Sequence, residues 1–251
     1  MEIAFVRKAR TAARLLLDSR VKAFGAVRRF VEGKKGLEIG GPSKAFERGL
    51  NAVPIYRKVG SLDNCDFSRN TTWKEHADEY RFSPNRPPGK NIFCDASDLS
   101  CLADDSYDFV LSSHNLEHFA NPVKALYEWK RVIRPGGGLV VLLPYYRGTF
   151  DHHRSPTPVD HMFDDWRNQT TEDDLFHLPE ILEKHDLSLD PLARSFDQFR
   201  ARSLDNVNNR CLHHHVFDEK NSRDLLTRSG YEVLATELVI PNQIFLLARV
   251  P

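Results

Sequence analysis

The sequence predicts an α/β protein built on a doubly wound, mostly parallel sheet of seven strands that closes with an antiparallel C-terminal hairpin. Three observations lead to this prediction. From residue 36 onward, short apolar segments alternate with helical segments. Residues 139–143 are apolar throughout, as a strand buried on both faces of a sheet requires. The last two apolar segments, 231–240 and 243–249, flank a turn at Pro241-Asn242, and so short a connection indicates an antiparallel pair.

The size and composition indicate a globular protein with a sizeable core. The chain has 251 residues, of which 41% are hydrophobic, and this length suits one large domain or a domain with an insertion. The 35 basic and 35 acidic residues cancel, which argues against nucleic acid as a partner. The four cysteines form no Cys-x-x-Cys pair, and no apolar run approaches the length of a transmembrane helix. Because basic residues also interrupt the N-terminal apolar positions, we expect a cytoplasmic protein without a signal peptide.

Residues 1–32 predict an N-terminal helical cap. Apolar side chains, among them Phe24, Val27 and Val31, recur there at three- or four-residue steps. The opposite side is mostly basic. Two interpretations remain open: the helix packs on the following domain, or it makes a peripheral contact with an anionic surface such as the inner face of the membrane.

Residues 33–144 predict the core of the sheet. Residues 64–90 contain several prolines and look irregular. The helix predicted over 122–134 has an apolar face and stops at Arg134-Pro135-Gly136-Gly137-Gly138. The strands predicted in this part of the chain are about 36–40, one within 53–62, about 90–94, 107–111 and 139–143.

Residues 145–216 interrupt this alternation. They are rich in His, Asp, Arg and Pro, and we interpret them as an inserted lid with short helices that lies over a substrate. Residues 217–251 resume the pattern with a helix near 218–229, which Gly230 ends, and with the closing hairpin. The chain therefore divides into a cap at 1–32, a core at 33–144, a lid at 145–216 and a segment at 217–251 that completes the core.

Acidic residues and glycines stand where the first three predicted strands end. Such strand ends are where an open α/β sheet binds its ligand. Gly40-Gly41 lets the backbone bend sharply and approach a ligand, and Glu38 places a carboxylate just before that bend. Asp63 follows the second strand, where a carboxylate can accept hydrogen bonds from ribose hydroxyls. Asp95-Ala96 follows the third, where an acid and a backbone amide suit a ring that carries an amino group.

Several motifs follow one another in a recognisable order. They are Glu38-Ile39-Gly40-Gly41, Asp95-Ala96, Tyr107-Asp108-Phe109-Val110, His114-Asn115-Leu116-Glu117-His118 and Arg131-Val132-Ile133-Arg134-Pro135-Gly136-Gly137. Through them the chain resembles the class I S-adenosylmethionine-dependent methyltransferases, of the type 11 kind. The resemblance covers about 36–144 and, in topology, 217–250. It implies a Rossmann-like fold and S-adenosylmethionine as the cofactor.

The resemblance also implies roles for individual residues. Gly40 and Gly41 would run beside the amino-acid portion of the cofactor, and Glu38 would hold the adjoining network. His114 would lie beneath the sulfonium, facing the substrate. The cofactor-binding residues that it implies are Glu38, Gly40, Gly41, Asp63, Asp95, Ala96, Ser112 and Ser113.

The acceptor side has candidates of its own. A His titrates near neutral pH and can accept a hydroxyl proton, so we favour His114 as this base, with His152 and His153 as rivals. The His and Asp residues of the lid suit a hydrogen-bonded polar network, a general base, or a divalent cation that orients vicinal hydroxyls. We expect no bound metal. The candidates for substrate binding are Arg147, Arg154, His161 and His215.

These features favour a methyltransferase that O-methylates a polar, hydroxyl-bearing small molecule, a sugar or a glycan. N-methylation of a small amine, a nicotinamide-dependent oxidoreductase and a non-catalytic scaffold attached to a membrane or a protein partner remain alternatives. Pro42 and Ser43 after Gly41 break the Gly-x-Gly-x-x-Gly pattern of a dinucleotide site, which disfavours the oxidoreductase.

Overall fold

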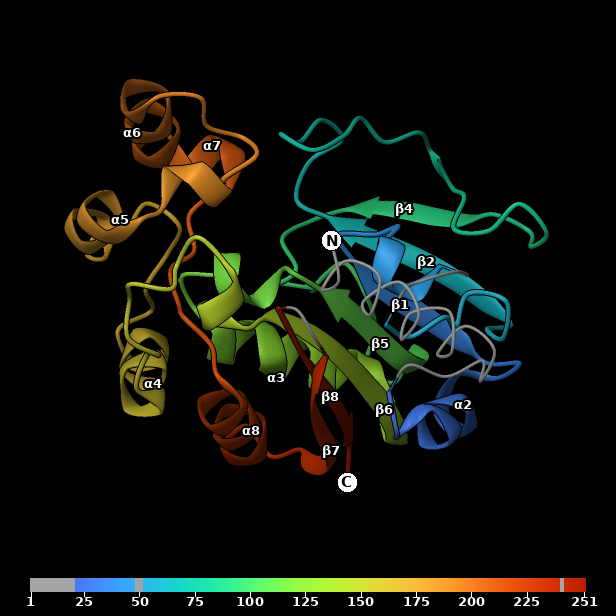
Figure 1. Ribbon diagram of the computed structural model, residues 1–251. Coiled ribbons are helices and arrows are strands. Elements are labelled where there is room, and N and C mark those ends of the chain that lie inside the picture. The colour runs from blue at the N-terminus through green and yellow to red at the C-terminus, as the bar shows by residue number, and fades with distance from the viewer. Residues whose placement is uncertain (1–20, 48–51, 240–241) are drawn as a thin grey trace, which may run out of the picture.

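The computed structural model describes residues 21–47, 52–239 and 242–251. Over these residues the chain forms an eight-stranded sheet in the order β3-β4-β2-β1-β5-β6-β8-β7, with helices on both faces (Figure 1). The strands are β1 Lys35–Ile39, β2 Ser61–Asp66, β3 Glu79–Tyr80, β4 Gly89–Phe93, β5 Tyr107–Ser113, β6 Ile133–Pro144, β7 Glu232–Val239 and β8 Gln243–Arg249. The α-helices are α2 Phe24–Val31, α3 Pro122–Val132, α4 Val159–Arg167, α5 Leu178–Lys184, α6 Phe196–Leu204, α7 Asn206–Asn209 and α8 Glu219–Arg228.

The pairing of the strands confirms the predicted fold class. The five central strands β4, β2, β1, β5 and β6 run parallel. β8 pairs antiparallel with both β6 and β7, so the closing hairpin is also confirmed. The prediction of seven strands was one short. The additional strand is β3, a two-residue segment antiparallel to β4 at the edge of the sheet, in a region whose prolines had hidden it.

The register brings the strand ends together at one edge of the sheet. Ile39, at the end of β1, pairs with Cys65 of β2 on one side and with Ser112 of β5 on the other. The residues that follow these three positions therefore lie side by side. They are Gly40, Asp66 and Ser113, and they come from parts of the chain that are far apart in sequence.

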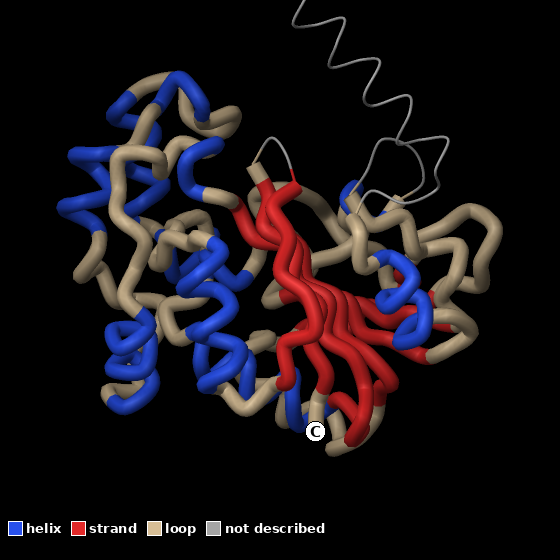
Figure 2. The backbone as a smooth tube through the Cα atoms, turned by 60° about the horizontal axis from the view of Figure 1, so that its bottom comes forward, coloured by secondary structure: helices blue, strands red, loops and turns tan. Residues whose placement is uncertain are grey.

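The sheet is covered by a separate apolar cluster on each face. One cluster packs α3, α4 and α8 against the sheet, with Trp129 and Met162 fully buried in it. The other packs α2 against the opposite face through Phe24, Val27 and Val31. Figure 2 shows the sheet as one twisted layer between these helices. The predicted cap helix is thus seen packing on the core over Phe24–Val31, and the remainder of that prediction, residues 1–20, lies outside the described residues.

The predicted insertion divides into two parts. α4 belongs to the core layer, because its Met162 and Phe163 join the cluster under the sheet. The rest of the segment, which we call the lid, covers residues 145–158 and 168–216, and its second part holds an apolar cluster of its own. Figure 1 shows α5, α6 and α7 standing apart from the sheet beside its carboxyl edge. Within the described ranges, none of the helices is long and apolar enough to cross a membrane.

Candidate active site

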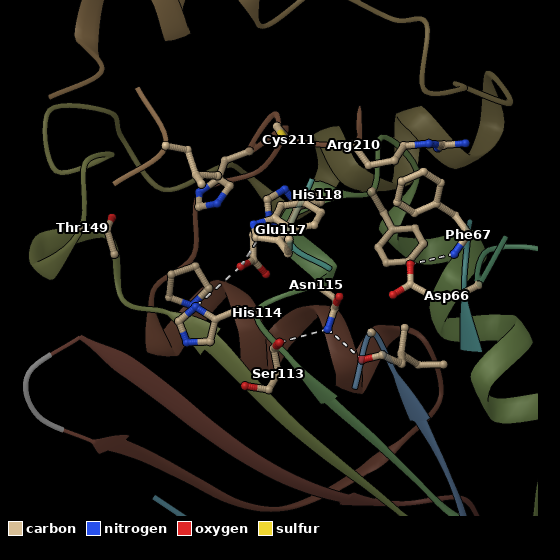
Figure 3. Close-up of a pocket in the computed structure, with 18 of the residues that line it drawn as sticks. Asp66, Phe67, Ser113, His114, Asn115, Glu117, His118, Thr149, Arg210 and Cys211 are labelled. Carbon is tan, nitrogen blue, oxygen red and sulfur yellow. Dashed lines mark hydrogen bonds and ion pairs between the residues drawn. The ribbon is translucent and has the colours of Figure 1, made fainter. Parts of the chain in front are cut away.

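A cavity of about 570 Å³ lies between the carboxyl ends of the strands and the lid. Its floor comes from the ends of β1, β2 and β5, with Gly40, Asp66 and Ser113 among the lining residues. Figure 3 shows lid residues Arg210 and Cys211 facing these strand ends across the cavity. A site of this kind, at the edge where parallel strands end, is the usual ligand site of an open α/β sheet.

The glycine turn after β1 is built for close approach. Gly40 has a φ of +69°, a left-handed conformation that favours glycine. A Cβ atom on Gly40 would lie 2.3 Å from Oδ1 of Asn115. The Asn115 amide holds this position by donating to the carbonyls of Ile39 and Ser113, each at 2.9 Å (Figure 3). Lys74 donates to the carbonyls of Gly40 and Gly41, so the turn is bound from both sides.

Glu38 supports the turn from beneath and does not line the cavity. Its side chain is fully buried and accepts hydrogen bonds from Tyr56 at 2.8 Å, from Tyr80 at 2.5 Å and from the backbone amide of Ser43 at 3.0 Å. Burial raises the pKa of the Glu38 carboxyl, against the lowering effect of these hydrogen bonds. Glu38 therefore acts on the site by fixing the path of the chain after β1.

The acid at the end of β2 is Asp66, and the expectation that Asp63 ends this strand was wrong. Asp63 lies in the middle of β2 and outside the cavity, where it accepts hydrogen bonds from the Lys90 amide at 2.9 Å and the Tyr107 hydroxyl at 3.1 Å. The reason is a shifted boundary. Val53 and Ile55, which predicted the strand, are buried in a turn-containing segment, and β2 begins only at Ser61.

Asp66 faces the cavity with part of its hydrogen-bonding capacity in use. One carboxylate oxygen accepts from the Phe67 amide at 2.9 Å and the other lies 2.8 Å from Nε2 of His76. The residue is 9% exposed. An ionised carboxylate has about four lone-pair positions, so Asp66 can still accept from a ligand hydroxyl.

Asp95 and Ala96 line the cavity after β4, as expected. Asp95 accepts from the amide and hydroxyl of Ser97, both at 2.8 Å, and from the guanidinium of Arg210 at 3.2 Å. Arg210 also lies over the ring of Phe67, 5.5 Å from its centroid. The lid thus contacts Asp95 of the predicted adenine region and Phe67, which follows β2.

The three residues at the end of β5 divide between core and cavity. Ser112 is fully buried outside the cavity, and its hydroxyl has no hydrogen-bond partner among the residues that the structure describes. Ser113 and His114 line the cavity. Burial lowers the pKa of His114 to about 4, so its imidazole is neutral at physiological pH. Its φ of +55° turns the chain sharply at the strand end.

A histidine of the lid, His213, reaches the cavity with a carboxylate behind it. Nδ1 of His213 lies 2.5 Å from Oδ2 of Asp151, and both residues are largely buried. Burial works against the charge on Asp151, but His213 and Arg154 outweigh it and lower the pKa of this carboxyl to about 2. For His213 burial also opposes the charge, and the Asp151 carboxylate overcomes it, so the pKa of His213 is raised.

Glu117 is the second acceptor-side group that faces His213. Its side chain is fully buried, and neither carboxylate oxygen has a hydrogen-bond partner within the described ranges. Nδ1 of His114 lies 3.9 Å, and Nε2 of His118 4.0 Å, from Oε1 of Glu117 (Figure 3). Burial raises the pKa of Glu117 to about 7. Two buried acceptor atoms open to the cavity are suited to a polar ligand, since leaving them unpaired is costly.

His213, Asp151 and Glu117 are the site residues that sequence reasoning missed. The run His213-His214-His215 was visible, but Asp151 lies 62 residues away from His213, and their pairing exists only in the folded chain. Glu117 stood between two histidines of a motif and gave no signal of its burial.

The other lid candidates lie outside the cavity lining. His152 and His153 pack their rings on each other 3.8 Å apart, and Nδ1 of His152 lies 2.9 Å from the Thr149 carbonyl oxygen. Arg147 is exposed and lies over the ring of Tyr146. None of these three side chains reaches the cavity, although their neighbours Thr149 and Phe150 line it.

Arg154, His161 and His215 also lie away from the cavity lining. Arg154 is 2% exposed and ties the lid together, with donations to Asp151 at 3.0 Å and to the His213 carbonyl at 2.8 Å. His161 and His215 belong to a separate cluster beneath the lid.

Comparison with known proteins gives the fold and, over part of the chain, a match to a family model. Residues 48–141 match the family model described as a methyltransferase domain. A solved S-adenosylmethionine-dependent methyltransferase from Mesorhizobium loti is 16% identical, covers 91% of this chain and 98% of its own, and gives a TM-score of 0.51. A putative methyltransferase from Bacillus halodurans C-125 is 12% identical over 91% of this chain and 97% of its own, with a TM-score of 0.50. No curated protein sequence matches the chain.

Proposed function

We propose that this chain, a class I S-adenosylmethionine-dependent methyltransferase by its fold and by the match of residues 48–141, methylates a hydroxyl group of a polar small molecule, a sugar or a glycan. The observation that carries the proposal is His213 in the wall of the cavity, paired with Asp151 behind it. The nature of the acceptor rests on that pair and on the open carboxylate of Glu117.

The strand-end half of the cavity fits S-adenosylmethionine. Gly40 and Asn115 both line the cavity, and the missing Cβ of Gly40 lets Asn115 pack against the turn and fix its backbone. The carboxylate of Asp66 is the candidate partner of the ribose hydroxyls, and Asp95 with Ala96 the candidate partners of the adenine. The cofactor supplies a methyl group on a sulfonium, already activated for transfer.

His213 is the candidate general base on the acceptor side. Its Nδ1–H donates to the ionised Asp151, which leaves Nε2 as the nitrogen with a free lone pair. Nε2 accepts the proton that the acceptor hydroxyl loses as its oxygen becomes the nucleophile. Asp151 fixes the imidazole in the correct tautomer and stabilises the imidazolium that forms.

Glu117 is the candidate for holding the acceptor in place. Its two oxygens are buried and without partners, so a ligand that brings hydroxyl groups satisfies them both. Because the pKa of Glu117 is raised to about 7, the carboxyl can donate as well as accept near neutral pH. A molecule with neighbouring hydroxyls, such as a sugar, meets this requirement better than an apolar aromatic compound.

The first test is methyl transfer from cofactor with a labelled methyl group to a panel of sugars, sugar nucleotides and small amines. We expect label on hydroxyl-bearing members. Labelling of amines alone would overturn O-methylation and leave the methyltransferase assignment standing, whereas calorimetry that detected no binding of S-adenosylhomocysteine would overturn the cofactor assignment itself.

The second test compares His213→Gln with His153→Gln. His213→Gln is expected to lower kcat by about 10²- to 10⁴-fold with little change in the Kd of S-adenosylhomocysteine, because it removes a base and no cofactor contact. His153→Gln is the matched control, since this exposed histidine lies outside the cavity lining and should leave kcat unchanged. Equal activity of the two variants would exclude His213 as the base.

A further inference from the structure

A second group of histidines lies outside the cavity, at the junction of the lid and the core. His161 comes from α4, His177 stands at the N-terminus of α5, and His215 comes from the segment that leads into α8. One ring nitrogen from each of the three lies within 4.8 Å of the others. The fold therefore brings three imidazoles together from the core helix, the lid and the segment that leaves the lid.

Asp165 completes this group as a fourth side chain. It follows His161 by one helical turn on α4, so both project from the same face. Its Oδ2 lies 3.6 Å from Nε2 of His161 and 3.7 Å from Nε2 of His215. Asp165 is 8% exposed and His215 is 1% exposed, whereas His161 and His177 are half-buried, so the group lies at the edge of the buried interior.

Two of the spacings lie close to the geometry of a bound metal ion. Nε2 of His161 and Nε2 of His177 face each other at 2.9 Å, and Oδ2 of Asp165 lies 3.6 Å from Nε2 of His161. In a tetrahedral zinc site the bonds are about 2.0–2.2 Å, so neighbouring ligand atoms lie roughly 3.3–3.5 Å apart. The two spacings lie on either side of this value, so small shifts of the side chains bring these atoms to zinc distances.

Hydrogen bonds alone leave the group incompletely paired. The His161–His177 contact uses one donor and one acceptor. Oδ2 of Asp165 and Nδ1 of His215 are buried with no hydrogen-bond partner among the described residues. Nε2 of His215 lies 3.3 Å from the Ala120 carbonyl oxygen and donates to it, so Nδ1 is the nitrogen of His215 that is free to bind a metal. Buried polar atoms are normally paired, and an unpaired one calls for an unseen ligand, water or ion. A cation would balance the buried carboxylate and occupy the lone pairs of the imidazoles.

The chemistry of the donor set indicates which metal the group would take. Neutral imidazoles and one carboxylate are borderline-soft donors that suit Zn²⁺ better than Mg²⁺ or Ca²⁺, which take oxygen ligands.

We propose that His161, His177, His215 and Asp165 bind one Zn²⁺ ion as a closed structural site that fastens the lid to the core. Four protein ligands fill a tetrahedral zinc site and leave no position for a substrate. None of the four side chains lines the cavity, so the proposal is independent of the acceptor and of the base. Through the ion, α4 in the core cluster is joined to α5, whose Leu178 and Ile181 belong to the lid cluster.

The direct test is metal analysis of the full chain, purified without a histidine tag and dialysed against metal-free buffer. We expect close to one zinc per chain in the wild type and less than a tenth of that in His177→Ala and in Asp165→Asn. Asp165→Asn keeps the shape of the side chain, so it tests the site even if His177→Ala does not fold. The matched control is His153→Ala, which alters a different group of potential ligands, His152, His153 and Asp186. This variant should keep the same zinc content as the wild type.

A second variant separates this site from the cavity. Glu117, His118 and His213 form another potential ligand group there, and His118→Ala removes one of its members. Loss of zinc from His118→Ala with retention in His177→Ala would overturn the proposal and move the ion to the cavity. Added Zn²⁺ that bound the wild type no more tightly than Asp165→Asn would overturn it as well.

A structural readout completes the experiment. Limited proteolysis of the wild type should show at least a tenfold increase in cleavage within 168–216 when a chelator removes the metal, and Asp165→Asn should match the chelated protein without chelator. An unchanged cleavage rate on zinc removal would contradict a role in fastening the lid.

Discussion

Gly40 and Gly136 share a left-handed backbone but not their surroundings. Gly40 has a φ of +69° and Gly136 a φ of +78°. An alanine costs roughly 1–2 kcal/mol of strain at either position. The added Cβ would meet Asn115 at Gly40, whereas it would meet nothing within 4 Å at Gly136. We expect both variants to be less stable than the wild type. Only Gly40→Ala should also weaken the binding of S-adenosylhomocysteine, by at least about tenfold as measured by calorimetry. Equal affinities in the two variants would contradict a cofactor site at this turn.

The pH dependence of the reaction provides a test of the base at the level of one residue. A raised pKa means that His213 stays protonated to a higher pH than an ordinary histidine does, and the protonated imidazole cannot accept a proton. We expect kcat/KM to fall as the pH drops through this region. Asp151→Asn removes the carboxylate that raises the pKa, so the acid limb should move to lower pH. Because Glu117 faces His213, the limb reports the pair of groups. An acid limb that stayed at the same pH in Asp151→Asn would exclude His213 as the general base.

At the scale of the element, the residue at which a strand ends decides which acid lines the cavity. Asp66 ends β2 at the cavity, and Asp63, three residues earlier, points its carboxylate at Lys90 and Tyr107. Asp66→Asn should raise the Kd of S-adenosylhomocysteine by about 10- to 100-fold, the effect of losing hydrogen bonds to a charged acceptor. Asp63→Asn is the isosteric control and should change it less than about threefold. A larger increase in Kd for Asp63→Asn than for Asp66→Asn would favour Asp63 as the ribose ligand.

The elements were easier to predict than their boundaries. The apolar run at 139–143 and the hairpin at the C-terminus were identified because burial on two faces and a short connection leave clear patterns. Asp63 was misplaced because Val53 and Ile55 are buried in a turn-containing segment, and burial alone does not distinguish such a segment from a strand. The helix α4 was assigned to the lid since its core-facing Met162 and Phe163 look the same in either setting.

At the scale of the whole molecule, Arg154 joins separate parts of the lid. It was predicted as a substrate ligand, but its guanidinium is buried against Asp151 and the carbonyl of His213, with Glu180 at 3.5 Å. Removing one partner of a buried ion pair costs about 3–5 kcal/mol. We expect Arg154→Met to lower the melting temperature and expose the lid to proteolysis. Arg147→Met, at an exposed position, should change stability by less than about 0.5 kcal/mol. A stable Arg154→Met variant that had lost only acceptor binding would support the original prediction.

The side of the cavity that we propose for the acceptor could not be predicted from the sequence, because contacts across the whole molecule form it. The cofactor half is made of short motifs, each of which follows its own strand, so order along the chain was sufficient. His213 and Asp151 meet only because the lid folds back over the strand ends, across 62 residues. No local pattern records such a contact.

The separate apolar cluster of the lid also bears on how this enzyme can change over evolutionary time. Leu178, Ile181 and Phe199 pack among themselves, while the sheet keeps two clusters of its own. Such a unit opens and closes cooperatively, and its opening free energy is set by its own contacts. Hydrogen exchange should therefore be faster in the lid than in β1 or β5. Substitutions in the lid part of the cavity wall then draw on the stability of the lid alone and leave the packing of the sheet unchanged.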